Sequence, residues 1–190
     1  SMFDSEIASY FEEHLKGLLD KRIKGLVLDL RDNPGGDLQQ VILIADRLLP
    51  EGLIVYTEDR NKKRSEAKSD AAELKLPITV LVNESSASAS EILSGALKDH
   101  KKGVLVGTKT FGKGLVQEVK YLDDGSGIKV TSARYFTPSG VCIQGIGIMP
   151  DIEVKPEEKY LNSPASQIPR AEDVQLKAAV EVINSWGYVR

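Results

Sequence analysis

The sequence is poor in several residue types that would narrow its chemistry. Its 190 residues include one cysteine, Cys142, which excludes an internal disulfide, and only two histidines. No apolar run reaches the roughly 18 residues of a membrane-spanning helix. A formal net charge of −3 gives no support for a nucleic-acid or anionic-membrane partner. The scarcity of these features leaves enzymes and protein-binding modules as the classes to consider.

The signatures of common cofactors are also missing. The chain has no P-loop, no dinucleotide fingerprint and no spacing typical of metal ligands. Residues 62–64 are all basic, but acidic residues lie on both sides of them, which favours a solvated hairpin over a nucleic-acid patch. We therefore expect no cofactor, no metal and no nucleic acid.

The overall composition is that of one domain with a substantial core, because 41% of the residues are hydrophobic and 28% are charged. A serine before Met2 is typical of a remnant of tag cleavage, so residues 1–2 are set aside. Residues 3–190 are expected to form a single domain. Its last part, residues 156–190, is predicted to be a wrapping loop followed by a helix.

Apolar periodicity predicts strands that alternate with helices, which indicates an α/β fold. Helices are expected over residues 3–21, 38–49, 87–100 and 173–186, with a short helical turn at 70–74. Strands are expected over residues 25–30, 53–57, 63–68, 78–82, 115–121 and 127–136.

Four serines lie where the strand at 78–82 gives way to a helix: Ser85, Ser86, Ser88 and Ser90. The first turn of a helix has N–H groups without intrahelical partners, and its dipole end is positive. A serine placed there can attack a carbonyl while the next N–H stabilises the developing oxyanion. Serine is equally a favoured N-cap, so the serines alone leave a structural role open.

A base for such a serine is not evident among the histidines, since neither His14 nor His100 lies in surroundings typical of a catalytic triad. Lys113 lies between two glycines, with an aromatic residue before them and a strand after them. In an apolar, partly dry pocket the neutral amine is favoured and can take a proton from serine. Gln117 could hold that amine by a hydrogen bond. The alternative is an ordinary turn with an exposed lysine.

Four motifs in sequence order carry a resemblance to a known family. They are LRDNPGG at 30–36, NESSASASEI at 83–92, GTKTFGKGLVQ at 107–117 and GVCIQGIGIMPDIEV at 140–154. Together they resemble the carboxy-terminal processing peptidases, the tail-specific serine proteases of family S41. The resemblance implies an α/β core like that of crotonase and Clp protease, built from ββα units with mixed sheets.

The resemblance also implies roles for particular residues. Ser88 corresponds to the nucleophile and Lys113 to the general base, 25 positions later. Gln117 corresponds to the glutamine that orients the lysine. Asp99, at the end of the nucleophile helix, corresponds to an aspartate with a supporting role.

The oxyanion hole implied by the family combines two backbone N–H groups. One belongs to the residue after the nucleophile, here Ala89, and the other to the Pro-Gly-Gly turn. Gly35 and Gly36 are both candidates for the second donor, and the sequence does not choose between them.

The function implied is endoproteolysis by a Ser-Lys dyad, at or from unstructured, apolar C-terminal tails of polypeptides, in an extracytoplasmic compartment. A homo-oligomer is possible. Family members carry a PDZ module upstream of this core, so the chain is expected to be a trimmed core, a processed form or a member without that module. Two alternatives remain: a non-proteolytic or latent binding and assembly module, and, further away, acyl-CoA chemistry on the crotonase-like core.

Overall fold

The computed structural model describes residues 2–186. Ser1 of the predicted tag remnant and the last four residues of the predicted domain therefore lie outside the described residues. The helices are α1 (Ile7–Asp20), α2 (Leu38–Leu48), α3 (Ala89–Asp99) and α4 (Val174–Asn184), with 3₁₀ turns η1 (Glu158–Tyr160) and η2 (Ala165–Gln167). The strands are β1 (Leu26–Asp29), β2 (Gly52–Asp59), β3 (Arg64–Ser69), β4 (Ile78–Val82), β5 (Gly103–Gly107), β6 (Leu115–Tyr121), β7 (Gly127–Phe136) and β8 (Ile152–Glu153).

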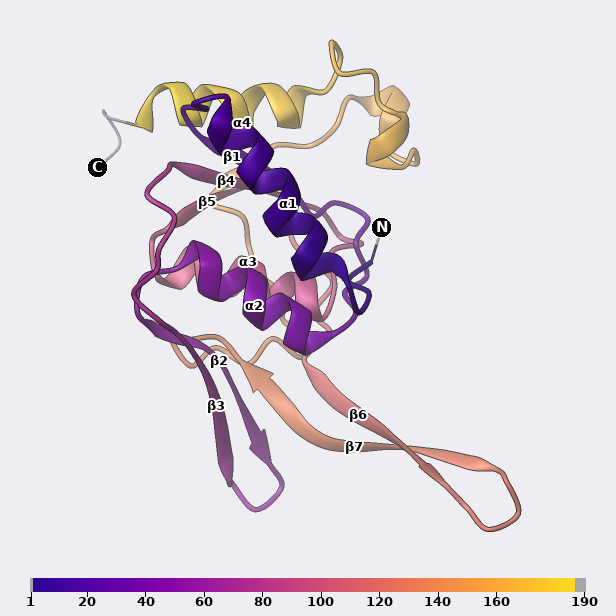
Figure 1. Ribbon diagram of the computed structural model, residues 1–190. Coiled ribbons are helices and arrows are strands. Elements are labelled where there is room, and N and C mark those ends of the chain that lie inside the picture. The colour runs from indigo at the N-terminus through magenta and orange to yellow at the C-terminus, as the bar shows by residue number, and fades with distance from the viewer. Residues whose placement is uncertain (1, 187–190) are drawn as a thin grey trace.

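A parallel sheet with strand order β1-β4-β5-β8 forms the centre of the molecule. All five residues of β4 are buried, as expected for an apolar, β-branched strand covered on both faces. Helix α4 covers one face through contacts that involve Leu81, Val106 and Ala179, and α2 and α3 cover the other (Figure 1). The strands end at a common edge, so the turns that follow β1, β4 and β5 lie near one another.

A second, antiparallel sheet has the order β3-β2-β7-β6. It extends away from the parallel sheet beyond α2 and α3, and the β6–β7 hairpin projects furthest (Figure 1). Several apolar side chains of this hairpin are exposed, including Val119, Tyr121 and Ile128. Strand β6 is the outer strand of this sheet, and it begins two residues after Lys113.

The predicted α/β class is confirmed, with the two strand directions separated into two sheets. The helices predicted at 38–49, 87–100 and 173–186 are confirmed to within two residues at either end. None of the helices in the described part of the chain has the length and apolar character needed to cross a bilayer. Asp173 caps α4 through its carboxylate, which accepts from Leu176 N–H.

Two expectations were wrong, and two strands were missed. Residue Phe3 is not helical, because its backbone pairs with Gly36 in a parallel bridge and α1 begins only at Ile7. The predicted helical turn at 70–74 is an irregular segment. Strands β5 and β8 were not predicted. Strand β5 is a short run that begins and ends with glycine, and β8 has only two residues, so neither is long enough to show the alternation of apolar and polar residues that identifies a strand.

Candidate active site

Ser88 occupies the sharp turn between β4 and α3, where it is the N-cap residue of the helix. Its backbone angles are φ +56° and ψ −117°. A side-chain-bearing residue adopts positive φ only infrequently, and such strain concentrates at functional sites. The Ser88 side chain is half-buried, so it remains reachable from solvent. A strained serine at a strand-to-helix turn is the arrangement that exposes the nucleophile of many serine hydrolases.

The other serines of this turn have different surroundings. The Ser86 hydroxyl is buried and donates to the Leu30 carbonyl at 2.7 Å. The Ser90 hydroxyl is buried and donates to the Asn33 carbonyl at 2.9 Å. Both serines therefore tie the turn to the segment that follows β1. Ser85 is exposed and lines a separate polar cavity.

The Pro-Gly-Gly turn lies directly against this serine turn. A Cβ on Gly35, which has φ +96°, would lie 2.8 Å from both Ala89 N and Ser88 Cβ. The Gly35 N–H is engaged, since it donates to Asn33 Oδ1 at 3.0 Å. Gly36 is exposed, and its N–H donates no hydrogen bond to any residue between 2 and 186. The absence of a side chain at Gly35 is what lets the two turns meet.

The lysine loop, residues 108–114, lies between the serine turn and the segment that precedes β8. The Phe111 N–H donates to the Ser86 carbonyl at 3.0 Å, and the Thr110 N–H donates to the Ile148 carbonyl at 3.1 Å. The loop is thus bonded on one side to the serine turn and on the other to the glycine-rich segment. These contacts bring together motifs that are far apart in the sequence.

Both glycines beside Lys113 are required by close backbone approach. A Cβ on Gly114 would lie 2.4 Å from Gln144 N, and one on Gly112 would lie 3.0 Å from Gly147 N. Gly112 also has φ +93°, a conformation that disfavours any side chain. The two glycines fix where the backbone of Lys113 lies.

Glu91 joins the serine turn to the lysine loop. Its Oε1 accepts from Thr110 Oγ1 at 2.6 Å and from Gly112 N–H at 2.7 Å. Its Oε2 accepts from Ser88 N–H at 2.9 Å and from Lys113 N–H at 2.8 Å. The side chain is 0% exposed. One buried carboxylate therefore contacts the backbone of both residues that the sequence singled out.

The side chains of Lys113 and Gln117 are exposed. Of the two alternatives left open for Lys113, the exposed side chain is the one observed, and the residues that the structure describes form no dry pocket around it. The reason lies in the antiparallel sheet, because the loop leads into its outer strand and the hairpin turns away from the helices (Figure 1). The arrangement fixes the backbone of the lysine and leaves its amine in solvent.

The opposite end of α3 carries Asp99 and His100. Asp99 Oδ2 accepts from Ser139 N–H at 2.8 Å, and the His100 ring nitrogen Nε2 lies 2.7 Å from the Leu53 carbonyl oxygen. With a rise of about 1.5 Å per residue, Asp99 lies roughly 16 Å along the helix axis from Ser88. Any support that Asp99 gives to the site acts through the turn it holds and through the helix.

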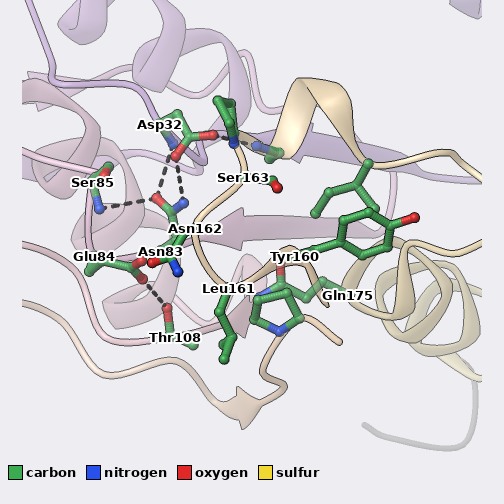
Figure 2. A pocket seen from close by; sticks show the side chains of 14 residues that line it. Asp32, Asn83, Glu84, Ser85, Thr108, Tyr160, Leu161, Asn162, Ser163 and Gln175 are labelled. Carbon is green, nitrogen blue, oxygen red and sulfur yellow. Dashed lines mark hydrogen bonds between the residues drawn. The ribbon is translucent and has the colours of Figure 1, made fainter. Parts of the chain in front are cut away.

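A polar cavity of about 350 Å³ lies beside the serine turn, where the turns after β1, β4 and β5 meet the 156–168 segment (Figure 2). Within it Asn83 donates to Asp32, and Thr108 donates to Glu84. Ser88 and Lys113 do not line the cavity. Across residues 2–186, no three His, Cys, Asp or Glu side chains lie close enough together to hold a metal ion.

Glu91 was not among the site residues predicted from the sequence. Its signal was present, since Ser88-Ala89-Ser90-Glu91 has the S-x-x-E spacing of a capping box, in which the glutamate accepts from the N-cap N–H. That pattern predicts the bond to Ser88. It does not predict the bonds to the lysine loop, which depend on tertiary structure.

Comparison with known proteins identifies the class to which this fold and site belong. The profile of Peptidase family S41 matches residues 1–154, and the chain belongs to this family. It is 49% identical over 144 residues to a carboxy-terminal-processing protease of Bartonella bacilliformis, covering 73% of this chain and 33% of that one. It is 45% identical over 184 residues to a carboxyl-terminal-processing protease of Synechocystis sp., covering 96% and 42%.

A solved structure gives the same assignment. The photosystem II D1 C-terminal processing protease superposes with a TM-score of 0.78 at 42% identity, over 82% of this chain and 41% of that one. The chain thus spans less than half the length of each of these relatives. The resemblance that the four motifs carried is confirmed at the level of family and fold.

Proposed function

We propose that this chain contains the catalytic machinery of a serine endopeptidase, with Ser88 as the nucleophile and Lys113 as the general base. The observation that carries the proposal is the Ser88 turn, in which a strained, half-buried serine begins α3 and packs against a glycine turn. The names of its relatives, which are processing proteases, support the same activity.

In the proposed reaction the neutral amine of Lys113 accepts the proton of the Ser88 hydroxyl as its oxygen attacks the scissile carbonyl. The ammonium then returns the proton to the leaving amine, and water hydrolyses the acyl-enzyme by the same route. Gln117 orients the lysine amine by a hydrogen bond.

The oxyanion of the tetrahedral intermediate is proposed to accept from Ala89 N–H and from the Pro-Gly-Gly turn. Of the two glycines, Gly36 fits the donor role better, because the residue is exposed and its N–H has no hydrogen-bond partner among the described residues. The Gly35 N–H already donates to Asn33. Gly35 instead keeps the space next to Ala89 N free of a side chain.

The substrates are proposed to be polypeptides with unstructured, apolar C-terminal tails. Two exposed apolar side chains near the site support this class: Phe111, 67% exposed in the lysine loop, and Ile146, 53% exposed in the segment bonded to it. An extracytoplasmic location is proposed from the relatives, one of which is a chloroplastic processing peptidase of Tetradesmus obliquus.

One observation favours a second candidate, a latent or non-proteolytic form. The Lys113 side chain is exposed, whereas a lysine that acts as a base is assisted by a dry environment that favours its neutral form. In the latent form, a bound substrate or a further protein segment would have to cover the lysine before cleavage could begin.

The test is hydrolysis of casein, or of a peptide with an apolar C-terminal tail, by the parent chain and three variants. Ser88→Ala and Lys113→Ala are expected to be inactive while folded by circular dichroism. Lys109→Ala, which removes another exposed lysine from the same loop, is the matched control and should retain the parent rate.

The outcomes separate the two candidates. Activity in Ser88→Ala would show that the nucleophile is another residue. A parent chain as inactive as Ser88→Ala would favour the latent or binding form.

A further inference from the structure

We infer that Glu91 is a positioning residue that holds the nucleophile turn and the lysine loop in register. The inference rests on the proposed Ser88 and Lys113 roles and adds a residue to which the proposed reaction gives no part. Glu91 itself does not contact the reacting atoms in the structure. It acts through the backbone of the two residues that do.

All the hydrogen-bond partners of the Glu91 carboxylate are donors. Each carboxylate oxygen accepts two hydrogen bonds, and the donors are three backbone N–H groups and one hydroxyl. The Thr110 hydroxyl oxygen accepts from Ile148 N–H at 2.7 Å, and its hydrogen is donated to Glu91. An ionised carboxylate matches a set of donors with no acceptor among them.

The charge of this buried group is compensated without a basic side chain. No ion pair involving Glu91 forms within the described part of the chain, and the side chain is 0% exposed. Burial of a carboxylate without partners is strongly unfavourable, so the N–H donors and the positive end of α3 must stabilise it. The lysine loop contributes three of those four donors, so the stabilisation of the buried Glu91 carboxylate depends on this loop.

A plain helix cap would not need these loop contacts. The bond from Ser88 N–H alone completes the glutamate half of a capping box. The bonds from Gly112 and Lys113 come from a segment more than 20 residues later in the sequence. Glu91 Oε2 is therefore shared between the peptide of the nucleophile and the peptide of the base, at 2.9 and 2.8 Å.

This sharing sets the separation of the two peptide planes from which the Ser88 and Lys113 side chains project. A misplacement of about 1 Å between catalytic groups can lower a rate about 100-fold. Glu91→Gln keeps the shape of the side chain but replaces one acceptor oxygen by an NH₂ group, which cannot accept from the N–H groups that face it. We expect the loop to shift away from the serine turn in that variant.

The first measurement is peptide hydrolysis by Glu91→Gln and by Ser94→Ala, the matched control. Ser94 is another buried polar residue of α3, and its hydroxyl donates to the Ser90 carbonyl, away from the lysine loop. At a temperature where both variants are folded, Glu91→Gln should lose about 30- to 100-fold in kcat with KM nearly unchanged. The control should keep the parent kcat. Equal kcat values in the two variants would overturn the inference.

The second measurement does not require activity. Amide hydrogen exchange of the unmodified protein should show slow exchange at Ser88, Gly112 and Lys113, and Glu91→Gln should accelerate all three together while Ser94→Ala accelerates none. Glu91→Asp, one methylene shorter, serves if the glutamine variant does not fold, with the same result expected. Rapid exchange at Lys113 in the unmodified protein would contradict the inference.

The two proposals fail in distinguishable ways. Hydrolysis that persists in Ser88→Ala would overturn the proposed function whatever Glu91 does. Parent-like kcat and unchanged amide exchange in Glu91→Gln, with Ser88→Ala inactive, would overturn only the positioning role.

Discussion

The two halves of the site are held in different ways. One half, called the nucleophile half after the role proposed for Ser88, comprises residues 83–88, the first turn of α3 and the Pro-Gly-Gly turn, and it contains buried side chains and close backbone contacts. The base half comprises the lysine loop and the start of β6. Its backbone is also hydrogen-bonded, through the Lys113 N–H to Glu91 Oε2, but the Lys113 and Gln117 side chains are exposed.

The difference follows from the two sheets. The nucleophile half lies at the end of the central parallel sheet, which is covered on both faces and leaves little freedom to the turns that follow its strands. The base half leads into the outer strand of the antiparallel sheet, whose hairpin projects from the molecule (Figure 1). The fold therefore fixes the turn that carries the proposed nucleophile, Ser88, while the side chain of the proposed base, Lys113, is exposed.

The largest expected effect is in the nucleophile half, at the strained backbone of Ser88. Ser88→Gly should abolish hydrolysis, a loss of at least about 10⁴-fold. It should also raise the free energy of unfolding by about 1 kcal/mol relative to Ser88→Ala, because glycine adopts positive φ without strain. Urea unfolding of the two variants measures this difference. Equal stabilities would mean that the turn stores no strain.

The next effect tests the contact between the two turns of the nucleophile half. Gly35→Ala should lower kcat about 10²- to 10³-fold, because its Cβ would crowd Ala89 N, and should destabilise the fold by a few kcal/mol. Gly125→Ala is the control, since Gly125 also has positive φ but has no atom within 4 Å of its added Cβ. The control should lose about 1 kcal/mol of stability and no activity. A similar kcat in both variants would place the oxyanion hole elsewhere.

A smaller effect is expected in the base half. Gln117→Ala should reduce kcat about 10-fold, because the proposed orienting hydrogen bond cannot form while Lys113 and its backbone contacts remain. The unfolding midpoint should not change, since the side chain is exposed. Kinetics and thermal unfolding of this variant check both statements. A loss as large as that of Lys113→Ala would give Gln117 a more direct part in the reaction.

The smallest effect on activity is expected at Asp173, which joins α4 to the end of β1. Its carboxylate pairs with Arg31 at 2.8 Å. Burial by itself raises the pKa of Asp173, but the hydrogen bond and charge of Arg31 and the Leu176 N–H lower the pKa more, so the net direction is downward. Because the pKa of Asp173 is lower in the folded than in the unfolded protein, the ionised carboxylate contributes to the free energy of unfolding. That contribution is fully present above the unfolded-state pKa, about 3.9, and is lost as the pH falls through the folded-state pKa.

Asp173→Asn should therefore destabilise the protein by about 2–4 kcal/mol at neutral pH, because the buried Arg31 loses a charged partner. The difference from the parent should shrink as the pH falls below about 4. The kcat of the folded variant should stay within about 3-fold of the parent, because the pair contacts neither half of the site. Urea unfolding at several pH values is the measurement. A pH-independent difference would show that the ionised pair is not the source of the stability.

Much of the fold was predictable because its elements carry local signals. The buried strand at Ile78–Val82 and the helix after it follow from apolar periodicity. The motifs identified the family, which the comparisons confirm. The pairing of Phe3 with Gly36 was not predictable, since an amphipathic run gives no sign that its first residue will join a distant glycine turn.

The site was predictable to a different degree in its two halves. The sequence pointed to the Ser88 turn through the strand, the serines and the helix start. It left open whether Lys113 is exposed or covered, because exposure depends on which segments pack over the loop. It also could not assign four donors to Glu91, three of which come from a loop that only tertiary structure brings near.

The most direct test of the Ser88-Lys113 dyad is covalent labelling of the chain with a fluorophosphonate, followed by fragmentation mass spectrometry to locate the adduct. We expect an adduct on Ser88, with a labelling rate that falls at least about 100-fold in Lys113→Ala and stays unchanged in Lys109→Ala. An adduct on Ser85, or equal labelling rates in the parent and Lys113→Ala, would contradict the proposed dyad.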